Sequence, residues 1–167
     1  YDNDLIVFPA PSESRPDMGV SLVSASGRYK AGVNGDEAAT MVQATLRFMR
    51  EYPDRSLGLV TLNQKQRDLL LEEWDRALAK DEVAAAYVEK WAEENDGLER
   101  FFIKNLENVQ GDERDVILFS TAFSVNANGV LPLNFGPLSL EGGERRLNVA
   151  ITRARRQVVL YTSFEPS

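Results

Sequence analysis

The sequence predicts a single α/β domain with a mainly parallel sheet flanked by helices. Short apolar stretches alternate with longer amphipathic ones along the chain, and this alternation is typical of βαβ units. A length of 167 residues suits one domain with its own core. No internal repeat or low-complexity tract suggests a boundary, so the prediction treats residues 1–167 as one unit.

The predicted strands are short apolar stretches bounded by turn residues. The clearest of them follows Asp115, where four apolar residues stand without a break. In chain order, the predicted strands are residues 5–8, 20–24, 56–61, 101–106, 115–121 and 157–162. The intervening residues 124–143 are rich in Asn, Gly and Pro, which predicts a long loop.

Four predicted helices separate these strands, and each has an apolar side. The first, residues 37–52, has a capping residue at Asn34, acidic residues in its first turn, and Pro53 directly after its end. Its core-facing stripe comprises Ala38, Met41, Val42, Ala44, Thr45 and Met49. The other predicted helices are residues 64–80, 83–95 and 145–155.

The composition excludes several classes of site. The chain has no Cys and no His, which excludes a disulfide framework, a thiolate metal site and His-based acid–base catalysis. No apolar run is long enough to span a membrane, and we expect a soluble cytoplasmic protein. The formal net charge of -7 makes the whole domain a poor binder of nucleic acid. Any such contact requires a local basic patch or a partner domain.

Two segments near the C-terminus carry the most specific signals. The first, residues 108–120, is Asn-Val-Gln-Gly-Asp-Glu-Arg-Asp-Val-Ile-Leu-Phe-Ser. Gly111 permits close approach of the backbone to a ligand, and the carboxylate of Glu113 can accept two hydroxyl hydrogen bonds, such as ribose offers. Taken alone, a polar turn that leads into a strand is the simpler interpretation.

The second segment, residues 144–156, is Glu-Arg-Arg-Leu-Asn-Val-Ala-Ile-Thr-Arg-Ala-Arg-Arg. Arg146 and Arg153 are seven residues apart, so both would emerge on a common face of a helix. For an Arg-rich helix taken alone, a solvated basic face is the simpler interpretation. The side that can pack on the sheet comprises Leu147, Ala150, Ile151 and Ala154.

In this order and at this spacing, the two segments resemble motifs V and VI of superfamily 1 helicases of the Upf-like branch. These helicases split their ATP site between two RecA-like domains, and both motifs belong to the second. The resemblance implies a RecA-like three-layer sandwich and predicts the second, C-terminal RecA-like domain of a longer protein. Two further segments resemble this branch: residues 1–9, which match the tail of the segment after motif III, and residues 34–38, whose Asn-x-x-Glu-Ala pattern a helix cap also explains.

The resemblance implies a role for each motif residue. Glu113 would contact the ribose of the nucleotide, while Gln110 and Gly111 would shape a loop that couples nucleic acid to the ATP site. Arg153 would be the arginine finger, because a planar, permanent charge stabilises the phosphoryl group in the transition state. Two further arginines, which either support the structure or brace the domain interface, are Arg155 and Arg156.

Residues 58–67 resemble motif IV, which in many relatives reads Thr-Pro-Tyr-x-x-Gln. Here Leu62 and Asn63 replace Pro and Tyr, which argues against an aromatic contact at this position. The resemblance implies a nucleotide contact for Gln66 and makes Arg67 a second arginine aimed at the phosphates. A strand that leads through a polar turn into a helix is also the common nucleotide-proximal geometry of α/β sheets.

The chain has no Gly-x-x-x-x-Gly-Lys-Thr phosphate loop and no Walker B acidic pair. The resemblance therefore implies ATP and Mg²⁺ as cofactors, with the Mg²⁺ held by a first RecA-like domain of the same parent chain and no metal ligand here. The other implied partner is single-stranded DNA or RNA, and the choice between them is open. We expect the isolated chain to be inactive as an ATPase.

Two other function classes remain as alternatives. A non-motor α/β module would bind a nucleotide or a protein without needing a second domain. A small phosphatase or nuclease would need a metal-binding carboxylate cluster or a Cys or Ser nucleophile. The acidic residues between 72 and 99 lie mainly on predicted helix exteriors, where a solvated face explains them.

Overall fold

The computed structural model describes residues 18–125, 130–131, 139, 141 and 143–164. The strand predicted at residues 5–8, the motif-like segment 1–9 and most of the loop predicted at 124–143 lie outside the described residues. The described elements are β1 (Gly19–Ser24), α1 (Gly35–Glu51), β2 (Leu57–Thr61), α2 (Gln64–Leu78), α3 (Glu82–Glu93), η1 (Glu94–Gly97), β3 (Phe102–Asn105), η2 (Leu106–Asn108), β4 (Arg114–Ser124), α4 (Gly143–Ile151) and β5 (Ala154–Ser163).

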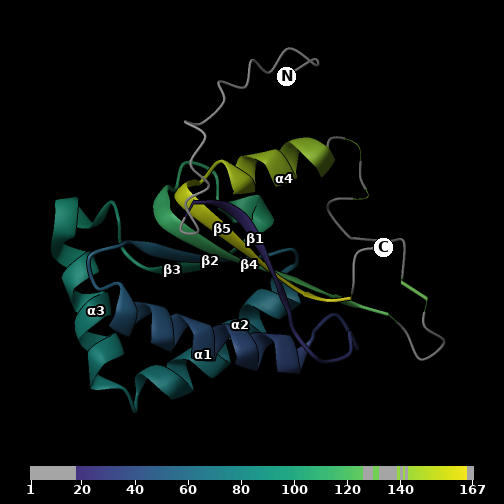
Figure 1. The fold of residues 1–167 in the computed structure, drawn as a ribbon, viewed down its shortest axis with the longest axis horizontal. Coiled ribbons are helices and arrows are strands. Elements are labelled where there is room, and N and C mark those ends of the chain that lie inside the picture. The colour runs from purple at the N-terminus through teal and green to yellow at the C-terminus, as the bar shows by residue number, and fades with distance from the viewer. Residues whose placement is uncertain (1–17, 126–129, 132–138, 140, 142, 165–167) are drawn as a thin grey trace.

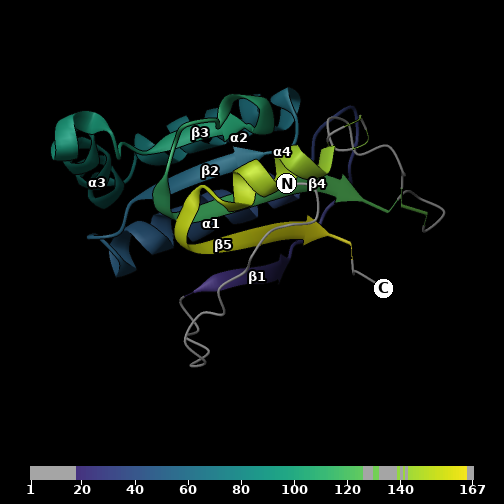
Figure 2. The same cartoon turned by 90° about the horizontal axis from the view of Figure 1, so that it is seen from above.

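The strands form one sheet in which every pair is parallel. Their order is β1-β5-β4-β2-β3, as seen from above in Figure 2. Parallel strands place all their carboxyl ends at one edge of the sheet, the carboxyl edge, and all their starts at the other, the amino edge. The predicted parallel sheet is therefore confirmed.

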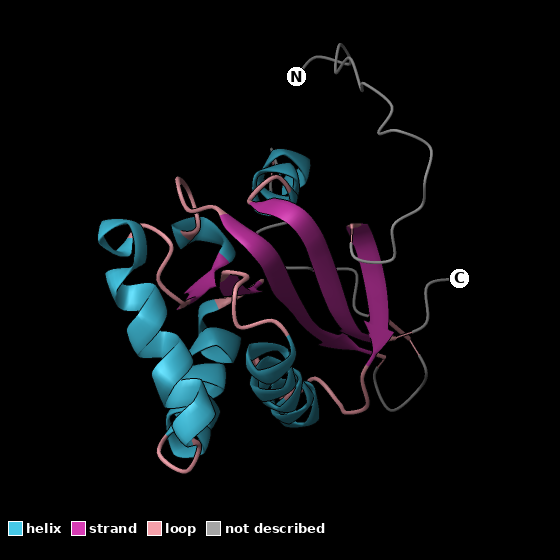
Figure 3. Ribbon diagram, turned by 60° about the vertical axis from the view of Figure 1, so that its left-hand side comes forward, coloured by secondary structure: helices cyan, strands magenta, loops and turns pink. Residues whose placement is uncertain are grey.

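Helices cover both faces of this sheet. Helices α1, α2 and α3 lie on one face and α4 lies on the other (Figures 1 and 3). The central strand β4 serves both cores: Val116 and Leu118 pack on the α1 side, while Ile117 and Phe119 pack on the α4 side. A strand buried on both faces needs a continuous apolar run, which explains why this strand was the clearest in the sequence. The three-layer RecA-like architecture is confirmed.

The first two helices begin as local capping rules require. Asn34 accepts a hydrogen bond from the Glu37 amide at 3.1 Å, and Asn63 accepts one from the Gln66 amide at 2.8 Å. Each cap satisfies one of the N–H groups that a first turn leaves free. The predicted stripe of α1 is also confirmed, because five of its side chains are buried and the sixth is partly buried: Ala38, Met41, Val42, Thr45, Met49 and Ala44.

The last helix is shorter than predicted. Helix α4 ends at Ile151, Thr152 and Arg153 form a turn, and β5 begins at Ala154. The Arg114 amide of β4 donates to the Arg153 carbonyl at 2.9 Å. The chain therefore leaves the helix and pairs with β4 before a further helical turn can form. The prediction that residues 145–155 are all helical is therefore wrong, and Arg153 does not lie on a face of α4.

Candidate functional site

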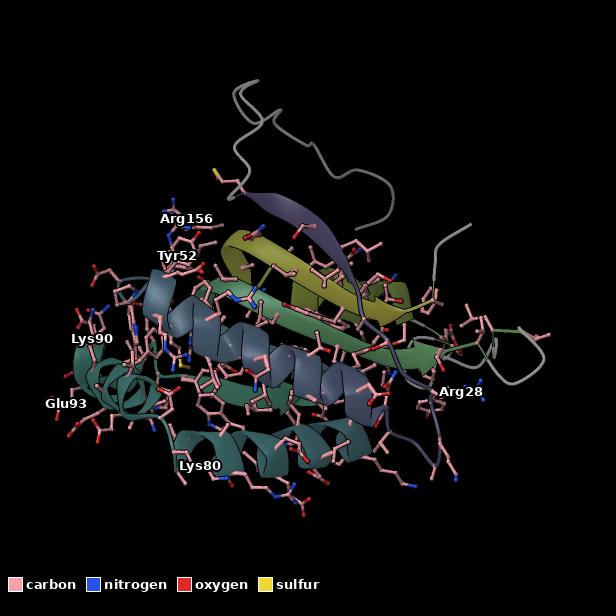
Figure 4. The ribbon with its side chains drawn as sticks, turned by 60° about the horizontal axis from the view of Figure 1, so that its bottom comes forward. Arg28, Tyr52, Lys80, Lys90, Glu93 and Arg156 are labelled. Atoms are coloured by element: carbon pink, nitrogen blue, oxygen red, sulfur yellow. The ribbon has the colours of Figure 1, made fainter. Side chains whose placement is uncertain are left out.

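The segments that resemble motifs V and VI meet at the amino edge of the sheet. One leads into β4 and the other into β5, which are neighbouring strands. The hydrogen bond from the Arg114 amide to the Arg153 carbonyl joins the two segments directly, and it places Glu113 one residue from that junction. Figure 4 shows this edge on the side where Tyr52 and Arg156 are labelled, with Arg28 at the carboxyl edge.

The turn before β4 presents its polar groups outward. Gln110 and Glu113 are exposed, whereas Val109 is fully buried and anchors the turn in the core on the α4 side. Gly111 has a φ of +86°, and a Cβ built on it would meet no heavy atom within 4 Å. The glycine thus supplies a left-handed backbone that side chains rarely adopt and leaves open space beside it.

Arg114 holds this turn from inside, a role that the sequence did not suggest. Its side chain is buried, with Nε and Nη2 donating to the Arg100 carbonyl at 2.8 and 2.6 Å and Nη1 donating to the Glu113 carbonyl at 2.5 Å. Its guanidinium also lies 4.7 Å from the centre of the Phe102 ring. Burial lowers the pKa of Arg114, and the nearby Asp112 opposes that change. The backbone at Glu113 is therefore fixed relative to the start of β3.

The backbone of Arg153 is fixed by pairing with β4, whereas its side chain makes hydrogen bonds to neutral acceptors. Its Nε donates to the Val149 carbonyl at 3.0 Å and its Nη2 donates to Thr152 Oγ1 at 3.3 Å. Both acceptors are neutral, and among the described residues no carboxylate forms an ion pair with Arg153. Its positive charge is therefore available to an anion at this edge.

Arg155 makes a different set of contacts. Its guanidinium pairs with Glu99, which lies just before β3, and with Asp115 of β4 at 3.2 Å. It also donates to Ser56 Oγ at 3.1 Å. These contacts tie the start of β5 to the starts of β2, β3 and β4, which supports the structural role that was one of its two predicted roles.

Gln66 and Arg67 lie away from this edge, at the start of α2 beyond the carboxyl end of β2. Gln66 is fully buried, and its amide group bonds the Asn34 backbone at 2.8 and 3.1 Å and Ser120 Oγ at 3.2 Å. Arg67 donates to the Ile103 carbonyl at 3.4 Å and to Asp68 at 2.8 Å. This placement argues against Arg67 and Arg153 contacting one phosphate group, and the ligand roles of Gln66 and Arg67 stay predictions.

A buried carboxylate organises the carboxyl edge. Glu37 is fully buried and accepts hydrogen bonds from Ser120 Oγ at 2.6 Å, the Ala122 amide at 2.8 Å and Ser163 Oγ at 3.0 Å. Burial raises the pKa of Glu37, and these hydrogen bonds oppose the rise in part. Ala122 has a left-handed φ of 64° within an irregular stretch of β4. Sequence reasoning assigned Glu37 only to the capped helix start, because nothing local shows its distant partners.

No group of three or more Asp or Glu residues among the described residues is arranged to hold a metal ion. No helix in the same part is long and apolar enough to cross a membrane.

Comparison with known proteins assigns the family. Residues 16–164 match a family model described as an AAA domain. The chain belongs to the AAA domain family. This AAA domain is 36% identical over 168 residues to an uncharacterized ATP-dependent helicase, MG140, of Mycoplasma genitalium, and 37% identical over 177 residues to its Mycoplasma pneumoniae homologue. It is 28% identical over 166 residues to the regulator of nonsense transcripts 1 homologue of Arabidopsis thaliana.

Coverage is uneven between this AAA domain and its relatives. The matches take in 96% of this chain for both Mycoplasma proteins and 93% for the Arabidopsis protein, but only 14%, 14% and 11% of the relatives' own lengths. The C-terminal domain of a possible DNA helicase from Lactobacillus plantarum superposes with a TM-score of 0.50 at 9% identity, over 90% of this chain and 77% of its own. That likeness shows the fold. The predicted membership in the superfamily 1, Upf-like helicase family is confirmed.

Proposed function

We propose that this domain is the second motor domain of a longer ATP-dependent helicase that moves along single-stranded nucleic acid. It would supply an arginine finger and a ribose contact to an ATP site shared with a first RecA-like domain. The observation that carries the proposal is the direct junction of the two motif segments at the amino edge, where the Arg114 amide bonds the Arg153 carbonyl. This junction brings Arg153 and Glu113 to one edge of the domain, where a second domain could close on them.

The residues at this edge fit a nucleotide. Arg153 has no carboxylate partner among the described residues, so its charge can face phosphate oxygens. Gly111 leaves room for close approach, and exposed Glu113 can accept hydrogen bonds from ribose hydroxyls. Mg²⁺, held by the first domain, would neutralise charge on the phosphates. This domain's own part would be to orient the nucleotide and to stabilise the charge that develops on the transferred phosphoryl group.

The segment between β3 and β4 supports a coupling role for the motif V loop. It leaves β3 at the carboxyl edge and enters β4 at the amino edge, so residues 106–113 run along the sheet from one edge to the other. Leu106 and Val109 are buried beside Ala150 of α4. A packed segment that reaches both edges can transmit a shift at a bound strand to the nucleotide.

The purified 167-residue chain should release no phosphate from ATP above background, even with Mg²⁺ and single-stranded nucleic acid present. It lacks a phosphate loop, so half of the proposed site is missing. The assay is phosphate release over time, with the full-length parent as the positive control. Turnover by the isolated chain would contradict a shared site and would favour a self-contained nucleotide-binding module.

The same chain should bind single-stranded nucleic acid only weakly at physiological salt. Its net charge of -7 opposes phosphate binding, and its basic residues near the C-terminus offer only local attraction. Fluorescence anisotropy with labelled single-stranded DNA and RNA over a salt series measures this. Sub-micromolar affinity at physiological salt would show that the domain binds the strand without its partner.

A further inference from the structure

A shallow depression lies beside the proposed ribose contact. Its volume is about 480 Å³, and its lining includes Gly111 and Glu113 on one side and Asn95, Asp96 and Leu98 on the other. The second group belongs to the loop between α3 and β3, which motif comparison did not single out. The depression therefore extends the proposed nucleotide site toward a part of the chain without an assigned role.

Leu98 is unusually open to solvent for a leucine. Its exposed fraction is 76%, the highest among the large hydrophobic side chains that the structure describes. Asn95, Asp96 and Gly97 precede it with φ values of 49°, 56° and 74°, so three consecutive residues are left-handed. Asn and Asp tolerate this conformation better than most residues. The resulting turn presents Leu98 at the surface of the depression instead of packing it in the core.

Side-chain hydrogen bonds hold the loop that carries Leu98 in a fixed position relative to the motif V turn. Arg100 Nε donates to the Gly97 carbonyl at 2.9 Å, and the Arg114 guanidinium binds the Arg100 carbonyl and the Glu113 carbonyl together. Arg155 adds an ion pair to Glu99. One buried guanidinium thus links the Arg100 carbonyl, two residues after Leu98, to the Glu113 carbonyl, so the two backbone segments keep a defined separation.

The charges around the site give a bound nucleotide a direction. Asp96 and Glu113 are exposed acids at the depression, and they repel phosphates. Arg155 also lines the depression, but its charge is paired with Glu99 and Asp115. Arg153, which lies outside the lining and has no carboxylate partner among the described residues, attracts phosphates. A nucleotide with its ribose at Glu113 would therefore extend its phosphates toward Arg153 and its uncharged end toward Leu98.

We propose that Leu98 forms an apolar contact with the base of the nucleotide whose ribose Glu113 binds, a role that rests on the proposed function. A nucleobase is a flat ring with polar edges and two faces that can make apolar contacts, and a leucine side chain can pack against such a face. The contact would favour nucleotides with a base over the same triphosphate without one. It would act on binding rather than on phosphoryl transfer, because Leu98 lines the depression whereas Arg153 does not.

The test compares Leu98→Ser with the wild-type full-length parent. Two readouts are measured: the KM for ATP, and the inhibition constant of ribose 5′-triphosphate, which lacks a base, as a competitor of ATP hydrolysis. Leu98→Ser should raise the KM for ATP about fivefold to tenfold, the size expected when part of a leucine's apolar contact is lost. The inhibition constant of ribose 5′-triphosphate and kcat should stay within about twofold of wild type, a difference of under about 0.5 kcal/mol.

Val83→Ser is the matched control, because Val83 is another exposed apolar residue, 49% accessible, near the start of α3 and outside the lining of the depression. Unchanged KM values for ATP in Leu98→Ser would overturn the inference. Equal weakening of ATP and ribose 5′-triphosphate would also overturn it, because it would place Leu98 against the first domain instead of the base. Arg153→Ala measured in parallel separates the two proposals. Normal ATP turnover by Arg153→Ala would contradict the proposed function, whatever the result for Leu98→Ser.

Discussion

Arg153→Ala in the full-length parent is expected to lower ATP turnover by at least about 100-fold. Arginine fingers contribute about 10³ to 10⁵ in rate, and Arg153 is a cation at the amino edge that forms no ion pair with a carboxylate among the described residues. Its charge would act mainly on the transition state, so kcat should fall far more than nucleotide affinity. The measurement is steady-state kinetics with saturating single-stranded nucleic acid, together with nucleotide binding.

The fold should survive this substitution. The bond from the Arg114 amide to the Arg153 carbonyl involves only backbone atoms, so alanine keeps it. The side chain loses its hydrogen bond to the Val149 carbonyl, a loss of about 1 kcal/mol. Thermal melting should therefore show a folded protein, and near-normal turnover in that protein would remove Arg153 from the mechanism.

Two further arginine variants sharpen the result. Arg67→Ala tests the predicted second phosphate contact, and its placement at the carboxyl edge leads us to expect a much smaller loss than from Arg153→Ala. Arg76→Ala removes an exposed arginine that pairs only with neighbours on α2, so it controls for the loss of one positive charge. Equal losses from Arg67→Ala and Arg153→Ala would show that closure of the two domains brings both edges to the nucleotide.

Glu37→Ala is expected to lower the free energy of unfolding by about 3 kcal/mol, because it leaves buried donors without an acceptor and opens a cavity. The Ala122 amide is the donor that suffers most, since Ser120 and Ser163 hydroxyls can rotate toward other acceptors. Glu37→Gln keeps the shape and an acceptor oxygen, and it should change stability by less than about 1.5 kcal/mol. Urea unfolding of the 167-residue chain provides the measurement.

The control for this pair is Glu72→Ala on α2, where the carboxylate makes only an exposed ion pair with Arg76. Such pairs contribute about 0 to 1 kcal/mol. A loss from Glu37→Ala no larger than from Glu72→Ala would show that the buried network is not a significant source of stability.

Glu37 also predicts a dependence of stability on pH. Its pKa in the folded domain is raised above the ordinary value of 4.5, so on acidification the folded chain takes up this proton before the unfolded chain does. Stability from this group therefore increases as the pH falls through the raised pKa toward 4.5 and decreases as the pH rises again. Other groups titrate in both proteins, so wild type minus Glu37→Gln isolates the effect. A difference that does not vary with pH would contradict the raised pKa.

Elements whose causes are local can be predicted from the amino-acid pattern alone. The Asn34 cap and the stripe of α1 depend on residues three or four positions apart, and the unbroken apolar run after Asp115 identified the central strand. The strings around Glu113 and Arg153 identified the family, which the comparisons confirmed. The end of α4 was predicted too late because helical periodicity alone does not show that β4 pairs with the chain from Ala154 onward.

Which residues share a site depends on how the strands are arranged in the sheet. The strand order and the parallel direction bring Glu113 and Arg153 together at the amino edge and place Arg67 at the carboxyl edge. The order of motifs along the chain does not contain this information. The bond between Glu37 and Ala122 joins residues 85 positions apart, and the clamp formed by Arg114 of β4 depends on where β3 begins on the far side of β2. Such contacts follow from the order in which strands pair in the sheet, and no pattern within a single segment specifies that order.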